Sequence, residues 1–157
     1  MNKPVNRRRF IQLLAAASGA TLLGTAGAHH TDSHFEDDAK HHIVYQLNKA
    51  DPKYIGSILF SAGEMIRKYG DDVEVVIAVF GEGIHLLGKR PQRPIPRDLQ
   101  QKASSLAAYG VAFHACGNTL KSLRWTKNDL LDFSKEVPIG IDDIMQLQER
   151  GFTYISW

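Results

Sequence analysis

Residues 73–80 read Val-Glu-Val-Val-Ile-Ala-Val-Phe, and this stretch decides the fold. Every residue in it except Glu74 is apolar, and most are β-branched, so the stretch predicts a β-strand. A strand with one face in water would alternate apolar and polar residues, and this one does not. The sequence therefore predicts a central strand that is covered by helices on both faces of its sheet.

The segments on either side of this strand alternate between extended and helical patterns. Before it lie a short apolar run at 42–47 and a helical repeat that starts at Asp51-Pro52 and stops at Gly70. After it, the patterns predict helices at 97–109, 118–125 and 142–150 and strands at 111–116, 137–141 and 152–157. This alternation predicts a single three-layer α/β domain, with a mostly parallel sheet of about five strands and helices on both faces.

The first 28 residues have the pattern of an export signal. In Arg7-Arg8-Arg9-Phe10-Ile11, an arginine pair is followed by one residue, a phenylalanine and an aliphatic residue, which is typical of twin-arginine signals. Ala26-Gly27-Ala28 suits the peptidase that removes such segments. Residues 13–23 are too few and too rich in Ala and Gly for a membrane span. We therefore expect residues 1–28 to be removed and the mature protein to be periplasmic, without a membrane span.

Removing this segment changes the charge balance of the chain. The whole sequence has 19 Lys and Arg against 17 Asp and Glu, but Lys3, Arg7, Arg8 and Arg9 lie in the predicted signal. The remainder has 15 basic and 17 acidic residues, so no basic excess argues for a nucleic-acid partner. The single cysteine excludes an intrachain disulfide, and with it a small disulfide-stapled scaffold.

Residues 29–41 are polar, and we expect them to form a flexible arm before the domain at 42–157. Counting His42, five of the seven histidines of the chain lie here, beside several acidic residues. Such side chains bind zinc, copper or nickel, but their spacing matches no defined site. Two interpretations are open, a solvated linker or a metal-capturing arm. The weak metal-ligand candidates are His29, His30, His34, His41 and His42.

The one cysteine of the chain stands where a predicted strand meets a predicted helix. Cys116 ends the apolar run at 111–116, and Gly117-Asn118-Thr119 opens the helical pattern that follows. Free backbone N–H groups at such a junction favour a thiolate over a thiol. Gly117 leaves room for a ligand, and Asn118 and Thr119 can donate hydrogen bonds to a charged sulfur. The alternative interpretation is a small buried apolar residue without chemistry.

Two further candidates are expected at the same edge, where the parallel strands end. Gly81-Glu82-Gly83 follows the central strand and lacks the third glycine of a dinucleotide-binding motif. Glu82 is a candidate proton carrier for Cys116, and Gly81 and Gly83 are candidate ligand contacts; the alternative is a glycine turn under a buried apolar patch. His114 faces the same side of its strand as Cys116, either as a base for the thiol or as a core histidine.

A proline-containing basic loop follows this segment, with cations at Lys89, Arg90, Arg93 and Arg97. We interpret it as a solvated loop. The alternative is a loop that attracts a small anion such as thiosulfate or sulfite.

Three stretches together resemble the DsrE/DsrF-like family, namely residues 75–87, 110–120 and 137–155. Cys-Gly-Asn-Thr at 116–119 is the most specific part, and the resemblance spans residues 42–157. It implies a small α/β domain that assembles as a homotrimer or homohexamer. In sulfur-relay systems, members of this family hold persulfide sulfur on a cysteine. By that resemblance Cys116 is the sulfur-bearing residue here.

The leading hypothesis is a periplasmic sulfur carrier with sulfurtransferase-like chemistry, in which Cys116 accepts sulfane sulfur and passes it on. It needs no cofactor, its partners are sulfur donor and acceptor proteins or small sulfur species, and we expect Cys116 near a subunit boundary. Its catalytic candidates are Cys116, His114 and Glu82, and its ligand contacts are Gly81, Gly83, Gly117, Asn118 and Thr119. The alternative is a non-catalytic oligomeric module that binds a small ligand, or a metal through the His-rich arm.

Overall fold

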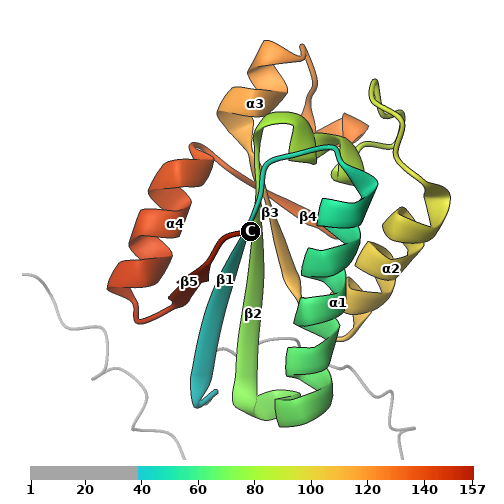
Figure 1. Ribbon diagram of the computed structural model, residues 1–157. Helices are drawn as coiled ribbons and strands as arrows, with labels where there is room; N and C mark the ends of the chain where they lie inside the picture. The colour runs from blue at the N-terminus through green and yellow to red at the C-terminus, as the bar shows by residue number, and fades with distance from the viewer. Residues whose placement is uncertain (1–38) are drawn as a thin grey trace, which may run out of the picture. The chain divides into compact units, whose positions relative to one another are not determined.

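The computed structural model describes residues 39–157 and shows a five-stranded sheet flanked by helices (Figure 1). The strands lie in the order β4-β3-β2-β1-β5, and every pairing is parallel. Their bounds are β1 His41–Leu47, β2 Val73–Val79, β3 Ala112–Cys116, β4 Ser134–Val137 and β5 Thr153–Ile155. The predicted α/β fold is confirmed, and the carboxyl ends of all strands meet at one edge of the sheet.

The middle strand of the sheet is β2, as the apolar run at 73–80 predicts. It pairs with β1 over all seven of its residues and, on its other side, with the first four residues of β3. Because β2 and β3 are neighbours, the segments that follow them start side by side.

The helices form layers on opposite faces of the sheet (Figure 1). α1 (Pro52–Tyr69) and α2 (Arg97–Ala108) cover one face, and α4 (Gly140–Glu149) covers the other. The short helix α3 (Gly117–Ser122) lies at the carboxyl ends of the strands. A local signal fixes the start of α1, because the Tyr54 N–H donates to the Asp51 carboxylate at 2.8 Å.

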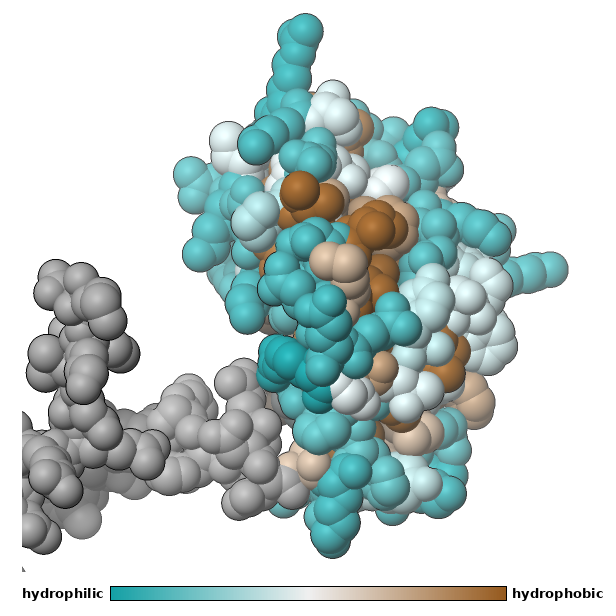
Figure 2. All heavy atoms as spheres, turned by 90° about the vertical axis from the view of Figure 1, so that its left-hand side faces the viewer, coloured by the Kyte–Doolittle hydropathy of each residue, from teal (hydrophilic) through white to brown (hydrophobic). Residues whose placement is uncertain are grey.

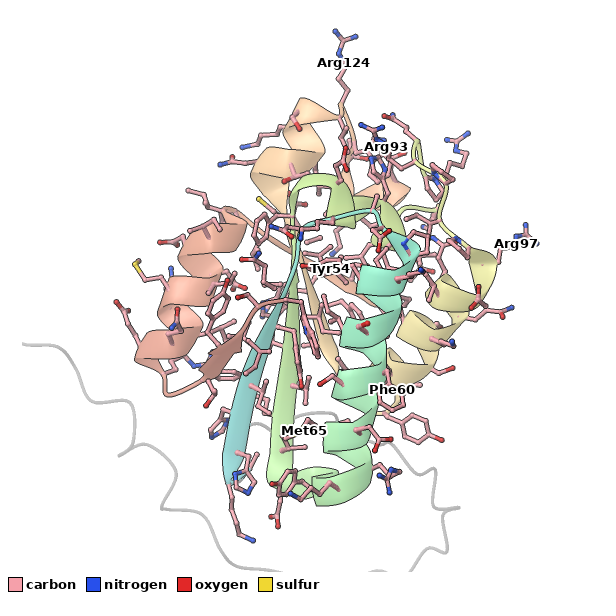
Figure 3. All side chains as sticks on the ribbon, viewed as in Figure 1. Tyr54, Phe60, Met65, Arg93, Arg97 and Arg124 are labelled. Atoms are coloured by element: carbon pink, nitrogen blue, oxygen red, sulfur yellow. The ribbon has the colours of Figure 1, made fainter. Side chains whose placement is uncertain are left out.

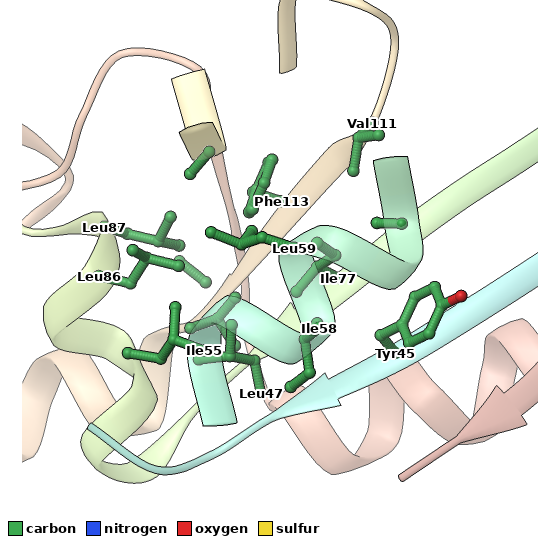
Figure 4. Close-up of a cluster of buried hydrophobic side chains, with 14 of the residues drawn as sticks. Tyr45, Leu47, Ile55, Ile58, Leu59, Ile77, Leu86, Leu87, Val111 and Phe113 are labelled. Atoms are coloured by element: carbon green, nitrogen blue, oxygen red, sulfur yellow. The ribbon is translucent and has the colours of Figure 1, made fainter. Parts of the chain in front are cut away.

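Apolar side chains fill the space on both faces of the sheet. The larger cluster joins the sheet to α1 and α2 and includes Leu47, Ile77 and Phe113, all fully buried (Figure 4). The smaller cluster joins Val76 and Ala78 to two aliphatic side chains of α4. Residues of β2 thus enter both clusters, which explains why its sequence is apolar throughout.

Two predicted strand boundaries near the end of the chain are wrong. The strand expected at 137–141 is β4, Ser134–Val137, and the chain is already helical from Gly140 onward. β4 lies at the edge of the sheet and its two middle residues are exposed, so its sequence lacks the apolar pattern that predicts a strand. The strand stops before Pro138, which has no N–H to give to the sheet. The last strand, β5, is shorter than the expected 152–157.

The predicted signal peptide and residues 29–38 of the predicted arm lie outside the described residues. At the end of that arm, His41 is already the first residue of β1. Across residues 39–157, no helix has the length and apolar character of a membrane span.

Candidate functional site at the carboxyl edge of the sheet

Cys116 is the last residue of β3 and lies at the edge where the strands end. The chain turns directly into α3, whose first residue is Gly117. The neighbouring strand β2 leads into a 3-10 helical segment, Gly81–Leu87. The two segments are tied together, because the Gly81 N–H donates to the Thr119 Oγ1 at 3.1 Å. The structure thus brings five of the predicted site residues to one corner of the domain, namely Gly81, Cys116, Gly117, Asn118 and Thr119.

The Cys116 sulfur is largely buried and lies against the start of α4. The residue is 6% exposed, and the Gly140 N–H donates to its Sγ at 3.2 Å. Because Gly140 is the first residue of α4, the sulfur faces the end of the helix that has free N–H groups and the positive end of its dipole. A side chain at position 140 would be crowded, since its Cβ would lie 3.0 Å from the Cys116 Cβ.

Four nearby N–H and O–H groups favour the charged form of this thiol. Burial alone raises the pKa of Cys116. The Gly140 N–H, the N–H and hydroxyl of Thr119, and the Asn118 N–H each lower that pKa, and together they outweigh burial. The Cys116 pKa therefore lies below that of an ordinary thiol. A thiol in this environment is ionised more readily than a free cysteine at the same pH.

His114 lies on the same face of β3 as Cys116, but its side chain is hydrogen-bonded to a residue of α4. Its Nδ1 is 2.7 Å from the Asp143 Oδ2, and the histidine is buried. A buried imidazole with a carboxylate partner fits the interpretation of a core histidine. Among the described residues, the side-chain partner of His114 is Asp143, and the side-chain partner of Glu82 is Arg93. In this described part of the chain, neither His114 nor Glu82 forms a hydrogen bond with the Cys116 sulfur.

Glu82 lines a surface hollow of about 490 Å³ beside the cysteine. Its Oε1 lies 2.8 Å from the Arg93 Nη2, and both side chains are more than half exposed. Thr119 lines the hollow as well, and its N–H and hydroxyl lower the Cys116 pKa, so this residue lies between the hollow and the sulfur. Cys116 itself is absent from the lining, which consists of Gly81, Glu82, His85, Gln92, Arg93, Thr119, Ser122 and Leu123.

The local backbone explains why glycine stands on both sides of Glu82. A Cβ at Gly83 would lie 2.3 Å from the Leu47 carbonyl oxygen, so only glycine fits there. Gly81 has a φ of +54°, which favours glycine as well. The aliphatic residues that follow are fully buried, namely Ile84, Leu86 and Leu87. These contacts favour the interpretation of a glycine turn under an apolar patch, and of the two glycines only Gly81 lines the hollow.

The sequence alone does not predict Gly140, Asp143 or His85 as parts of this corner. For Gly140 the sequence does contain a usable signal, because a glycine between a proline and an amphipathic helix allows another part of the chain to approach its backbone closely. Asp143 lies in the first turn of a helix, where an acidic residue is ordinary and indicates no partner. His85 stands inside an apolar run and has no signal of its own.

The predicted metal ligands are only partly described. His29, His30 and His34 lie outside the described residues. The ring of His41 packs on Tyr69 with 4.4 Å between centroids, and the His42 Nδ1 lies 3.1 Å from the Glu74 Oε2. Within residues 39–157, no group of three or more His, Cys, Asp or Glu side chains is placed to hold a metal ion.

An exposed apolar patch, here called the α4 patch, surrounds the start of α4. It consists of Ile139, Ile141 and Met145, each about half exposed, and Gly140 lies between the first two. Figure 2 looks onto the α4 side of the domain and shows hydrophobic residues gathered among polar ones. Contiguous exposed apolar side chains of this kind mark contact surfaces.

Comparison with known protein families identifies the family of this chain. A family model described as the DsrE/DsrF-like family matches residues 41–157, almost all of the described chain. The chain belongs to the DsrE/DsrF-like family. The resemblance found in the sequence is thereby confirmed.

Solved structures show that the DsrE/DsrF-like fold is shared with distant proteins. MTH1491, a protein of unknown function from Methanobacterium thermoautotrophicum, is 21% identical with a TM-score of 0.67, over 74% of this chain and 99% of that one. The ychN protein from E. coli is 16% identical with a TM-score of 0.57, over 76% of this chain and 99% of that one. At these identities the likeness shows the fold alone. No curated protein matches the chain.

Proposed function

We propose that this DsrE/DsrF-like protein carries sulfane sulfur as a persulfide on Cys116. The observation that supports the proposal most directly is the hydrogen bond from the Gly140 N–H to Sγ at 3.2 Å. With the donors from Asn118 and Thr119, it lowers the Cys116 pKa and so increases the ionised fraction near neutral pH. The thiolate is the nucleophile in thiol–disulfide exchange. It is also the form of cysteine that attacks a sulfane sulfur.

Loading and release are both exchanges of one S–S bond for another. In loading, the Cys116 thiolate attacks the outer sulfur of a donor R–S–SH, the donor's S–S bond breaks, and the donor leaves as R–S⁻. In release, an acceptor thiolate attacks the outer sulfur of the Cys116 persulfide, and Cys116 leaves as a thiolate. A low pKa makes Cys116 a good leaving group, so the donors that assist loading also assist release. Neither step needs an oxidant, a reductant or a cofactor.

The test is the intact mass of the purified protein after incubation with polysulfide. We expect the wild type to gain the mass of one sulfur atom and to lose it on treatment with a reductant. Cys116→Ser is expected to gain nothing, and its circular dichroism shows whether it still folds. No gain in the wild type, or an equal gain in Cys116→Ser, would overturn the proposal.

We also propose that the carrier is a homotrimer or homohexamer with Cys116 near a subunit boundary. The α4 patch supports this, because two of its residues directly flank the glycine that touches the sulfur. We propose that the protein acts in the periplasm. There, a neighbouring subunit that covered the α4 patch would limit oxidation of the Cys116 thiol. Ile141→Glu is expected to shift sedimentation to smaller species, whereas Gln101→Glu, an exposed site on α2, leaves it unchanged. An unchanged assembly in Ile141→Glu would exclude this interface.

A binding module without turnover is the second candidate, and the hollow beside Thr119 favours it. Such a module would bind its ligand equally well in Cys116→Ser. A metal-capturing arm is a further candidate, with His29, His30, His34, His41 and His42 as its possible ligands. Removal of residues 29–38 would abolish metal binding by such an arm and leave persulfide formation on Cys116 unchanged.

A further inference from the structure

The hollow beside Thr119 offers a ligand one positive and one negative side chain. Arg93 and Glu82 form an ion pair of 2.8 Å, and they are 56% and 57% exposed. An exposed ion pair of this kind contributes little to stability, so a ligand can open it at low cost. Figure 3 shows Arg93 above the carboxyl ends of the strands, whereas Arg97 at the start of α2 points away from the domain.

A buried histidine also lines the hollow. His85 is 4% exposed and lines the hollow, and its Nδ1 accepts a hydrogen bond from the Gln92 N–H at 3.4 Å. Because Nδ1 accepts, the ring proton of the neutral imidazole is on Nε2. Burial, and to a lesser extent Arg93, lower the His85 pKa, so the ring stays neutral at neutral pH. The ring also packs edge-on against Trp125, with 5.2 Å between the ring centroids.

The charges of the hollow decide which kind of ligand fits. A ligand with only negative charge would take Arg93 and leave Glu82 unpaired beside it. A ligand with only positive charge would take Glu82 and leave Arg93 unpaired. A zwitterion satisfies both, with its carboxylate on Arg93 and its ammonium on Glu82. The volume of about 490 Å³ lies within the range of small-ligand sites and exceeds the size of one amino acid.

We propose that this hollow binds the zwitterionic end of a small amino-acid or peptide thiol. Thr119 lines the hollow and lies in α3, the helix that starts directly after Cys116, so the hollow borders the site of the cysteine. Insofar as the ligand delivers sulfur, the inference rests on the proposed function. The bound persulfide R–S–SH would then give its outer sulfur to the Cys116 thiolate and leave as R–S⁻. Binding itself requires no chemistry at Cys116.

The test is calorimetric titration with S-methylglutathione, a zwitterionic peptide thioether that cannot transfer sulfur. We expect saturable binding to the wild type and equal binding to Cys116→Ser. Arg93→Gln and Glu82→Gln are each expected to weaken binding about tenfold, because each removes a charge-assisted contact. Arg97→Gln is the matched control in the same loop region and is expected to bind like the wild type.

Derivatives of the probe test the two charges separately. N-acetylation removes the ammonium and is expected to weaken binding to the wild type about tenfold, but to have little further effect on Glu82→Gln. Thiosulfate, which has only negative charge, is expected not to displace the probe at equal concentration. The inference would be overturned if S-methylglutathione showed no saturable binding or if thiosulfate displaced it. It would also be overturned if neither Arg93→Gln nor Glu82→Gln changed the affinity for S-methylglutathione.

Failure of this inference and failure of the proposed function give different results. If polysulfide loads Cys116 but S-methylglutathione does not bind, the zwitterion site is wrong and the carrier stands. If S-methylglutathione binds as expected but neither polysulfide nor glutathione persulfide loads Cys116, the site stands and the carrier is wrong.

Discussion

Among single residues, Thr119 connects more parts of the site than any other described here. Its Oγ1 accepts from the Gly81 N–H at 3.1 Å, and its hydroxyl and N–H both lower the Cys116 pKa. Thr119→Val keeps the shape and removes the hydroxyl, so we expect a higher Cys116 pKa and alkylation at neutral pH slowed by roughly three- to tenfold. Thr119→Ser keeps the hydroxyl and is expected to react like the wild type. Iodoacetamide kinetics across pH measure this, and equal rates for all three proteins would contradict it.

The lowered Cys116 pKa also makes stability depend on pH. Between the folded pKa and the higher unfolded pKa, the unfolded chain binds more protons, so stability rises with pH. The contribution is fully present above the unfolded pKa of about 8.5 and is lost as the pH falls through the folded pKa. We expect the unfolding free energy of the wild type, relative to Cys116→Ser, to increase from about pH 6 to about pH 9. Urea unfolding at several pH values measures it, and a flat difference would contradict it.

The residues at this corner differ in how far the sequence predicts them. Cys116 and its neighbours at 117–119 are contiguous, so a strand–helix junction places them together without knowledge of the fold. Gly140 lies 24 residues further on, and its contact with the sulfur depends on where β4 and α4 meet. Glu82 was expected near Cys116 and lies at the adjacent hollow, because the 3-10 segment and Arg93 turn it outward.

At the scale of elements, the first turn of α4 fixes the geometry at the sulfur. In Gly140→Ala the new Cβ would lie 3.0 Å from the Cys116 Cβ and 3.4 Å from the Phe80 Cβ. We expect the crowding to lower the unfolding free energy by about 1–3 kcal/mol and to raise the Cys116 pKa by moving the Gly140 N–H.

Gly63→Ala is the matched control for this substitution. Gly63 lies inside α1, and a Cβ there would meet nothing closer than the Leu106 Cδ2 at 3.7 Å. Alanine in a helix interior is expected to leave stability unchanged or to raise it by up to about 1 kcal/mol. Urea unfolding compares the two variants, and equal effects would show that close packing at the start of α4 is unimportant.

The elements with the strongest patterns are those that the sequence predicts best. β2 and α1 have long apolar or amphipathic runs that end at clear signals, and their bounds were predicted within one or two residues. β4 was misplaced because an edge strand of four residues with exposed Lys135 and Glu136 has no apolar period to detect. Edge strands of this kind depend on tertiary pairing, here with β3, rather than on their own sequence.

At the scale of the whole molecule, the sequence of residues 1–28 predicts export by the twin-arginine route. Arg7→Lys combined with Arg8→Lys keeps the charge but removes the arginine pair that defines the pattern. We expect this double variant to accumulate in the cytoplasm with residues 1–28 still attached, as shown by cell fractionation and intact mass. Arg9→Lys is the control and is expected to be exported and cleaved. Normal export of the double variant would exclude the twin-arginine route.

The position of the Cys116 sulfur behind the first turn of α4 has a kinetic consequence. A side chain that is only 6% exposed reacts with a bulky reagent only during moments when that turn opens. At high reagent concentration the rate should therefore level off at the opening rate, at the same plateau for any bulky reagent. In the proposed carrier, the rates of sulfur loading and release would then be limited by the rate of this opening. A donor or acceptor protein of the proposed carrier that displaced this turn on binding would increase the rates of both loading and release.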